Sequence, residues 1–141
     1  MRKKYEIVIT VIGLILFCYA EGWGTDWRWF ASISYSDYFY DAQGITRQPN
    51  GMSCVWYKRI LNDEDRIDYV AKFGEKYKDM EHVIALLELD CKGKRSRYLN
   101  IIYYSKEGKV IESDDLPQGK ADWKYIIPDT VGEKLFNIVC K

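Results

Sequence analysis

The sequence is poor in histidine and carries no net charge, and both shortages exclude classes of function. Its 141 residues include one histidine, His82. Catalysis that depends on histidine and a metal site rich in histidine are therefore both disfavoured. The 21 basic residues balance 21 acidic ones, which argues against a strongly basic nucleic-acid-binding protein. The chain has no nucleophile elbow, phosphate-binding glycine loop, HExxH motif or paired CxxC motifs, and we expect no cofactor.

The sequence also lacks an apolar run long enough to cross a bilayer. Its longest run, Ile7 to Phe17, has 11 residues, whereas a spanning helix needs about 20. Basic residues precede the run, and the small residue Ala20 follows it before a polar, glycine-rich stretch. This pattern is typical of a secretory signal peptide over residues 1–20, which leaves one domain over residues 21–141.

Two alternatives to cleavage remain open for this segment. It could be retained as a membrane anchor, although Glu6 and the shortness of the run count against spanning. A lipid could also be attached at Cys18, although lipoprotein signals place a small residue before the cysteine and Phe17 is bulky. Contact with a membrane is expected only under these two alternatives.

Signal-peptide removal changes both the charge and the cysteine count. Three basic residues and one acidic residue are lost, so 18 basic and 20 acidic residues remain and the formal charge becomes −2. Cys54, Cys91 and Cys140 stay in the chain. Export places them in an oxidising compartment, where a disulfide is expected.

The rest of the chain is rich in aromatic residues, with five Trp and 12 Tyr, and strand-like segments dominate it. Acidic residues precede a helix predicted over residues 66–73, and Thr130 with Glu133 forms a capping box before a C-terminal helix. We therefore predict an α+β domain with an antiparallel sheet of about six strands, a short helix in the 63–74 region and a C-terminal helix. The predicted strands cover residues 27–33, 38–40, 52–61, 82–91, 95–105 and 110–113.

Alternation along two strands assigns side chains to faces. In the first strand, Trp27, Trp29, Ala31 and Ile33 are expected to share one apolar face. In residues 52–61, Met52, Cys54 and Trp56 share a face. Cys54 is interpreted as a small buried hydrophobic residue there, with a reactive thiol or an intermolecular disulfide as the alternative. Trp29, Trp56 and Trp123 are expected in the core or at its edge, and the tyrosines in part on a binding surface.

Glu88 and Asp90 are the only carboxylate pair that merits a catalytic hypothesis. They lie two apart on a predicted strand, so they share a face and could act as acid and base in a small hydrolase. The favoured interpretation is a solvated strand face, paired with basic residues between Lys94 and Arg97. His82 is interpreted as a surface residue at the entry of the same strand, without a catalytic partner.

Taken together, these motifs resemble the surface-adhesin protein E-like domain, a small exported bacterial module. The matching residues, in order, are Trp27, Phe39-Tyr40-Asp41, Ile45, Arg47, Val55-Trp56, Glu88 to Cys91, Tyr103-Tyr104, Gly108, Trp123, Pro128 and Cys140. The resemblance covers nearly all of residues 21–141. It implies an antiparallel sheet with the C-terminal helix laid against it, and a disulfide between Cys91 and Cys140. Cys54 is an additional cysteine that the family pattern does not require.

The resemblance also implies a function. We expect a non-enzymatic exported binding protein that contacts a protein or a cell-surface component, with self-association through a sheet edge as one mode. It would reside in the periplasm, on the outer-membrane surface or outside the cell. The alternative is a structural or assembly subunit of the cell envelope without a soluble ligand. The adhesin after which the family is named binds host extracellular-matrix and serum proteins, but that activity belongs to one branch and no residue motif here carries it over.

The N-terminal interpretation makes a direct prediction about mass. We expect the exported protein to lack residues 1–20 and to begin at Glu21, because the cleavage pattern ends at Ala20. Intact-mass spectrometry of the protein from an extracytoplasmic fraction measures this. A mass equal to that of the full chain, or one that begins at a lipid-bearing Cys18, would contradict it.

Overall fold

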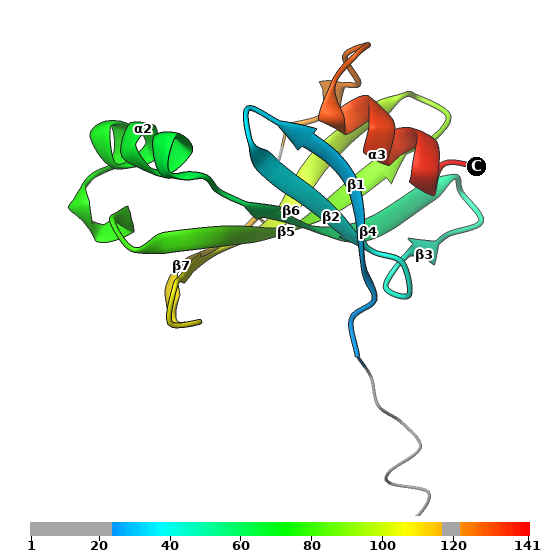
Figure 1. Cartoon of the computed structure of the whole chain (residues 1–141). Helices are drawn as coiled ribbons and strands as arrows, with labels where there is room; N and C mark the ends of the chain where they lie inside the picture. The colour runs from blue at the N-terminus through cyan, green and yellow to red at the C-terminus, as the bar shows by residue number, and fades with distance from the viewer. Residues whose placement is uncertain (1–23, 117–121) are drawn as a thin grey trace, which may run out of the picture.

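The computed structural model describes residues 24–116 and 122–141 (Figure 1). The signal-peptide, anchor and lipidation hypotheses concern residues 1–20 and lie outside this range. None of the helices in the described part is long and apolar enough to cross a membrane. The elements, in order, are β1 (Trp27–Ile33), β2 (Ser36–Asp41), β3 (Thr46–Arg47), β4 (Met52–Ile60), α2 (Asp63–Phe73), the 3-10 helix η1 (Glu75–Tyr77), β5 (Met80–Asp90), β6 (Arg95–Ser105), β7 (Val110–Asp115), β8 (Lys124–Tyr125) and α3 (Val131–Val139).

The strands form one antiparallel sheet in the order β1-β2-β4-β5-β6-β7. The two-residue strands β3 and β8 pair with β4 and β6 outside that order. Because β4, β5 and β6 are the longest strands and lie in the middle, they set the twist and the extent of the sheet. The predicted fold class, with about six principal strands and two helices, is confirmed.

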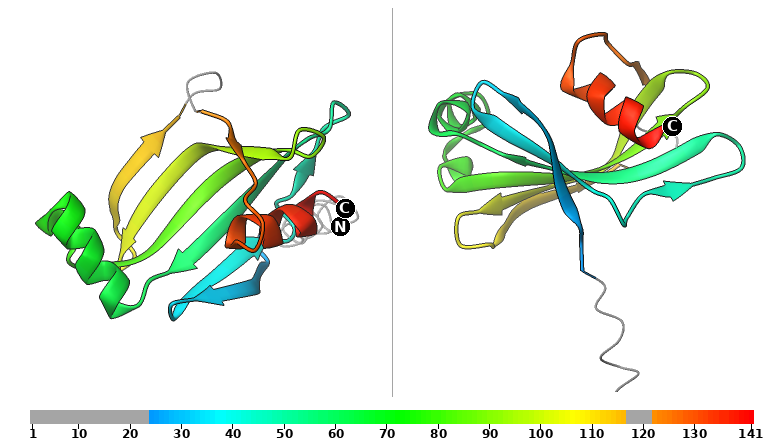
Figure 2. Two further views of the ribbon diagram at one scale, coloured as in Figure 1. Left: turned by 90° about the horizontal axis from the view of Figure 1, so that it is seen from above. Right: turned by 45° about the vertical axis from the view of Figure 1, so that its right-hand side comes forward.

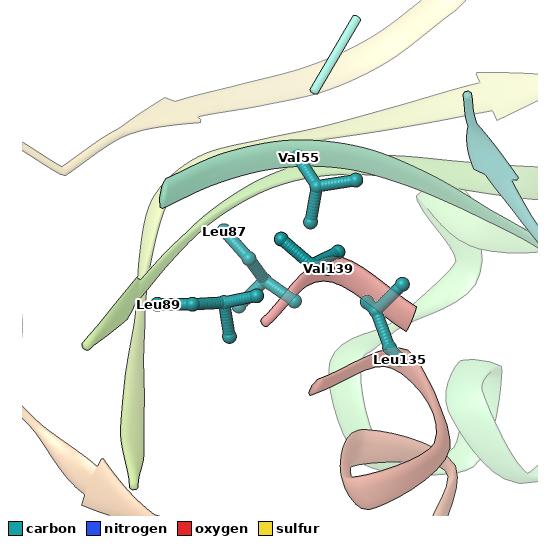
Figure 3. Packing of buried hydrophobic residues seen from close by; sticks show 5 residues of the cluster. All are labelled: Val55, Leu87, Leu89, Leu135 and Val139. Atoms are coloured by element: carbon teal, nitrogen blue, oxygen red, sulfur yellow. The ribbon is translucent and has the colours of Figure 1, made fainter. Parts of the chain in front are cut away.

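Helix α3 packs across the sheet and forms the main core with it (Figure 3). Thr130 caps the helix, since its side chain accepts a hydrogen bond of 3.2 Å from the amide of Glu133. The Glu133 carboxylate in turn accepts one of 2.8 Å from the amide of Asp129, so the reciprocal bond of the predicted capping box goes to the residue before the cap and not to Thr130 itself. One side of the helix is buried against strand residues, and the cluster consists of Val55, Leu87, Leu89, Leu135 and Val139.

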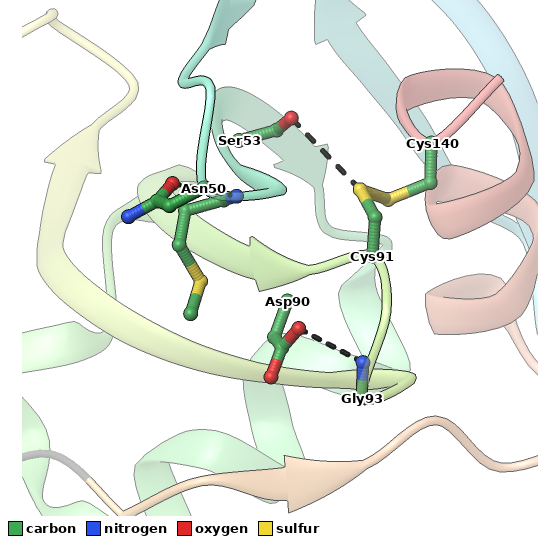
Figure 4. Close-up of a disulfide and its surroundings, with 7 residues drawn as sticks. Asn50, Ser53, Asp90, Cys91, Gly93 and Cys140 are labelled. Atoms are coloured by element: carbon green, nitrogen blue, oxygen red, sulfur yellow. Dashed lines mark hydrogen bonds between the residues drawn. A yellow bond between two sulfur atoms is a disulfide. The ribbon is translucent and has the colours of Figure 1, made fainter.

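A disulfide fixes the end of this helix to the end of a central strand (Figure 4). Cys91 follows β5 directly, and Cys140 follows α3 directly. Their Cα atoms lie 5.4 Å apart across a sequence separation of 49 residues. The pairing is the one that the family resemblance implies. It links the last turn of the chain to the strand whose side chains Leu87 and Leu89 contribute to the core.

Helix α2 and η1 build a second cluster over the other end of the sheet, on the same side as α3 (Figure 2). Asn62 caps α2 by accepting a hydrogen bond of 2.7 Å from the amide of Asp65, so the helix begins at Asp63 rather than at residue 66. A positive φ of 105° at Gly74 ends it. The cluster buries Leu61, Tyr77 and Met80 against partly buried neighbours that include Tyr69 and Tyr103.

The predicted face of the first strand is wrong because β1 contains a bulge. The register jumps between Trp29 and Ala31, which leaves Phe30 without a partner on β2. Trp29 is 59% exposed and Ile33 is 44% exposed, whereas Ala31 is buried. Phe30 instead packs against the main core. The bulge thus turns one aromatic side chain inward and leaves Trp29, expected at the core, on the surface.

The disulfide generates a prediction about stability. We expect Cys140→Ser to lower the free energy of unfolding by about 4 kcal/mol under oxidising conditions, because the bond closes a loop of about 50 residues in the unfolded chain. Urea unfolding of the mutant and the parent protein measures the difference. Cys54→Ser is the matched control, since Cys54 is free and its loss keeps the bond. Equal midpoints for Cys140→Ser and the parent would contradict the prediction.

Candidate functional site

One side of the sheet is left uncovered by the described helices, because α2 and α3 both lie on the other side (Figure 1). Side chains that are opposite one another in an antiparallel pair share a face, so the strand register assigns residues to this side. We call this surface the open face. Its members come from β1, β2, β4, β5 and β6 and include Trp27, Trp29, Phe39, Cys54, Trp56, Lys58, Ile60, His82, Ile84, Leu86, Ile102 and Tyr104. The same register places Glu88, Asp90, Arg95 and Arg97 on this side.

Lys58 gives the open face a positive charge among aromatic rings. Its ammonium nitrogen lies 4.8 Å from the ring centroid of Trp27 and 5.4 Å from that of Phe39. Both distances are within the range of a cation–π interaction, which holds the long side chain flat against the sheet. The arrangement presents a localised cation on an apolar, aromatic surface.

The outer margins of the open face are the most accessible. Trp29 on β1 is 59% exposed, and Ile60 at the end of β4 is 37% exposed. The central members, such as Ile84 and Leu86, are half-buried because neighbouring strands crowd them. The ion pairs of Glu88 with Arg97 and of Asp90 with Arg95 lie on the same side, at the end near the disulfide. Aromatic side chains are enriched in the buried centre of protein interfaces. The open face can therefore bind an apolar partner surface.

His82 belongs to the open face rather than to a catalytic site. Its ring is stacked on Tyr104, with centroids 4.8 Å apart and an interplanar angle of 13°. Its Nδ1 lies 3.1 Å from a carboxylate oxygen of Glu81. The expected surface position holds in part, since the stacked ring is only partly exposed. It extends the aromatic surface toward the end of the sheet that carries α2.

The carboxylates of Glu88 and Asp90 are buried and held by arginines, so the expectation of a solvated strand face is wrong. Arg97 Nε donates to Glu88 Oε2 at 2.6 Å, and Arg95 Nε donates to Asp90 Oδ2 at 2.8 Å. Both arginines lie in the predicted 94–97 segment. Each carboxylate therefore has its own cationic partner, which is a structural arrangement and not that of an acid and a base sharing a substrate.

The indole of Trp123 covers both ion pairs. Its ring centroid lies 4.8 Å from the guanidinium carbon of Arg95 and 4.5 Å from that of Arg97. Shielding from water explains how these pairs persist on the open face. Trp123 was expected near the core, and it is partly buried in this role. Across residues 24–116 and 122–141, no group of three or more side chains forms a candidate metal site.

Hydrogen bonds lower the pKa of Asp90. The backbone amide of Gly93 donates to Asp90 Oδ1 at 2.8 Å and is the largest cause, followed by the hydrogen bond from Arg95 (Figure 4). Gly93 suits this turn because an added Cβ would lie 2.4 Å from Asp90 Oδ2. Asp90 thus closes the β5–β6 turn next to the disulfide.

Cys54 differs from the expected buried hydrophobic residue. Ser53 and Val55 are the buried residues of this part of β4, and Cys54 lies half-exposed on the opposite side. Its thiol takes no part in a disulfide. Burial of the thiol, followed by the negative charge of Glu88, raises the pKa of Cys54. A raised pKa disfavours the thiolate, which argues against a reactive cysteine at neutral pH.

The two free edges of the sheet differ in their capacity to pair with another chain. Strand β7 carries Glu112, Asp114 and Asp115, and charges at an edge oppose strand addition. Strand β1 is less charged, but its bulge at Phe30 interrupts the regular ladder. Of the two edges, β1 is the better candidate for self-association.

Lys58 was not singled out from the sequence, although a signal for it existed, and Phe39 was named only as a residue of the family pattern. Lys58 lies two residues after Trp56 and four after Cys54, so strand alternation places all three on one side. The contact with Trp27 was not predictable, since it depends on the order of β1, β2 and β4. Trp29 and Cys54 were assigned to the core because both types are often buried.

Comparisons with known proteins were made for the whole chain. A family model described as surface-adhesin protein E matches residues 27–141. Two solved structures of protein E from Haemophilus influenzae are similar to this fold at 16% identity. The first has a TM-score of 0.51, and the match covers 83% of this chain and 88% of that chain. The second, crystal form II, has a TM-score of 0.52, and the match covers 83% of this chain and 91% of that chain. No curated protein matches the chain.

The lowered pKa of Asp90 makes stability depend on pH. Its charged form is favoured in the folded state, so its contribution is present above the unfolded pKa, about 3.9, and is lost as the pH falls through the lower folded pKa. We expect Asp90→Asn to be less stable than the parent at pH 7, and the difference to shrink below pH 4.

Urea unfolding at a series of pH values from 2 to 7 measures this difference. Glu107→Gln is the control, because Glu107 belongs to an exposed ion pair with Lys109. A constant difference between Asp90→Asn and the parent across the series would contradict the prediction.

Proposed function

The chain belongs to the surface-adhesin protein E family, and we propose that it is an exported, non-enzymatic protein that binds a partner through its open face. The partner is a protein or a surface component outside the cytoplasm. Adhesins are binding proteins, and the one carboxylate pair that merited a catalytic hypothesis is engaged by arginines. The proposal therefore places the function of the protein on a binding surface and not in a catalytic site.

The open face is the observation that carries this proposal. A single-layered sheet of this length exposes an apolar side unless a second layer covers it, and both described helices lie on the other side. Contiguous apolar surface rimmed by polar groups marks interaction sites on soluble proteins. Lys58 adds a preference for a partner that places a carboxylate or another anionic group beside apolar side chains.

Export of residues 21–141 as one domain is part of the proposal. The N-terminal pattern supports it, and so does the disulfide between Cys91 and Cys140, because such bonds persist in oxidising compartments. The domain would act in the periplasm, on the outer-membrane surface or outside the cell.

Self-association through strand β1 is a second mode that the proposal includes. The strand is an edge of the sheet, and two copies could pair along it on either side of the bulge. Because Trp29 lies on this strand, such a dimer would extend the open face instead of covering it.

We expect Trp29→Ser to weaken binding by about 30-fold, because tryptophan is enriched among the residues that dominate binding energy and Trp29 is the most exposed member of the open face. Beads coated with residues 21–141 are scored for attachment to cultured epithelial cells and to isolated outer-membrane vesicles. Phe73→Ser is the matched control, since Phe73 on α2 is 57% exposed and lies on the helix side of the sheet. Equal attachment by Trp29→Ser and the parent, or an equal loss for both variants, would contradict the proposal.

A further inference from the structure

A cavity of about 260 Å³ lies on the helix side of the sheet, on the opposite side from the open face. Its walls come from β1, β2, β4, β5 and β6 and from the first two turns of α3. Phe30, Leu87 and Leu135 supply apolar surface. Three tyrosines and Arg59 supply polar atoms. Mixed walls of this kind are typical of small-molecule sites, in which a few polar groups fix the orientation of an apolar ligand.

Two of the tyrosines share one hydrogen bond and leave one donor unused. The hydroxyl oxygens of Tyr57 and Tyr98 lie 3.1 Å apart, so one hydroxyl donates to the other. The accepting hydroxyl keeps its own hydrogen, for which no acceptor exists among the residues that the structure describes. Burial, with a further effect from Tyr98, raises the pKa of Tyr57 well above its usual value. The Tyr57 hydroxyl therefore keeps its proton at neutral pH, and one O–H of the pair is available to a ligand.

Arg59 contributes a second unused donor. Its Nη2 donates to Asp65 Oδ2 at 2.7 Å, and its guanidinium lies 5.6 Å from the ring centroid of Tyr38. These two contacts fix the plane of the group. Its Nε is buried and has no hydrogen-bond partner in the described part of the chain. A buried N–H without an acceptor costs free energy, and a ligand oxygen that accepts from it removes that cost.

The charge around the cavity favours an anion over a neutral acceptor. Asp65 accepts from Nη2 and offsets much of the charge of Arg59, whereas Nε keeps an N–H without an acceptor among the described residues. Val131 and Gly132, in the first turn of α3, also line the cavity, and that end of a helix carries a partial positive charge. A carboxylate has two oxygens, which matches the two unused donors of Arg59 and the tyrosine pair.

From these donors and walls we infer that the cavity binds a small carboxylate with an apolar body, with the carboxylate at Arg59 Nε and the tyrosine pair and the apolar body against Phe30 and Leu135. The volume of about 260 Å³ fits a ligand of about ten non-hydrogen atoms. Such a site is separate from the open face, so small-molecule binding and adhesion use opposite sides of the sheet. Free carboxylates and the C-terminal residue of a peptide share this chemistry.

The inference is tested by titrating residues 21–141 with small ligands and monitoring the amide signals by two-dimensional NMR. The probes are hexanoate, its neutral counterpart hexanamide, and a tripeptide that ends in leucine. We expect hexanoate to shift the amides of Val131, Gly132 and Tyr98 with a Kd of about 1 mM, the affinity usual for a ligand of this size. Hexanamide should bind at least fivefold more weakly. Tighter binding of the tripeptide than of hexanoate identifies a peptide terminus as the source, and the reverse identifies a free carboxylate.

Two variants keep the test decisive. Gly132→Leu adds a side chain beside the cavity, and an added Cβ there meets only Thr130 Oγ1 within 4 Å, at 3.5 Å. We expect it to fold and to lose at least tenfold in affinity. Arg59→Lys can keep the pair with Asp65 but lacks the Nε donor, so at least a fivefold loss is expected. Asn137→Leu, which places leucine at an exposed position of α3, is the control and should bind as the parent does.

Three results would overturn the inference. The first is hexanoate shifts spread over the whole surface, without a cluster at α3 and β6. The second is equal affinity for hexanoate and hexanamide. The third is parental affinity in a folded Gly132→Leu variant. None of these results affects adhesion through Trp29, which lies on the other side of the sheet.

Discussion

The attachment of α3 to the middle of the sheet is the contact on which the rest of this structure depends. A domain of about 120 residues can bury only a modest core, and small domains often add covalent links for that reason. Here the core residues Leu135 and Val139 of α3 meet Leu87 and Leu89 of β5. The disulfide joins the residues that follow β5 and α3, and it fixes the position of the helix on the strand. One side of the sheet is thereby committed to the helices, and the other side is left to solvent or to a partner.

Contacts between charged groups and aromatic rings stabilise the side of the sheet that has no helical layer. Lys58 lies flat across the rings of Trp27 and Phe39, and Trp123 lies across the two arginines that hold Glu88 and Asp90. Each contact shields a charged group with an aromatic ring. This explains why a composition with so many aromatic residues can coexist with a small core: many of the rings pack on charges and on strand surfaces rather than in a central cluster.

Much of the fold was predictable because strand alternation and helix caps are local signals. The capping box at Thr130 and Glu133 marked α3, and the long apolar strands marked the centre of the sheet. The bulge at Phe30 was not predictable, since it adds one residue without changing the composition, and everything N-terminal to it changes face. The acidic run marked the 63–74 region as helical, but Asn62, not that run, caps the helix and sets its first residue at Asp63.

The position of the disulfide constrains the order in which an exported chain can mature. Cys140 lies 49 residues after Cys91, so a chain exported N-terminus first would present Cys54 and Cys91 before the partner of Cys91 is outside the membrane. A bond between these two early cysteines would leave Cys140 without its partner and α3 without its anchor. If the chain is exported in this way, oxidation faster than translocation would misplace the bond, and correct maturation would require either a delay or the exchange of that bond.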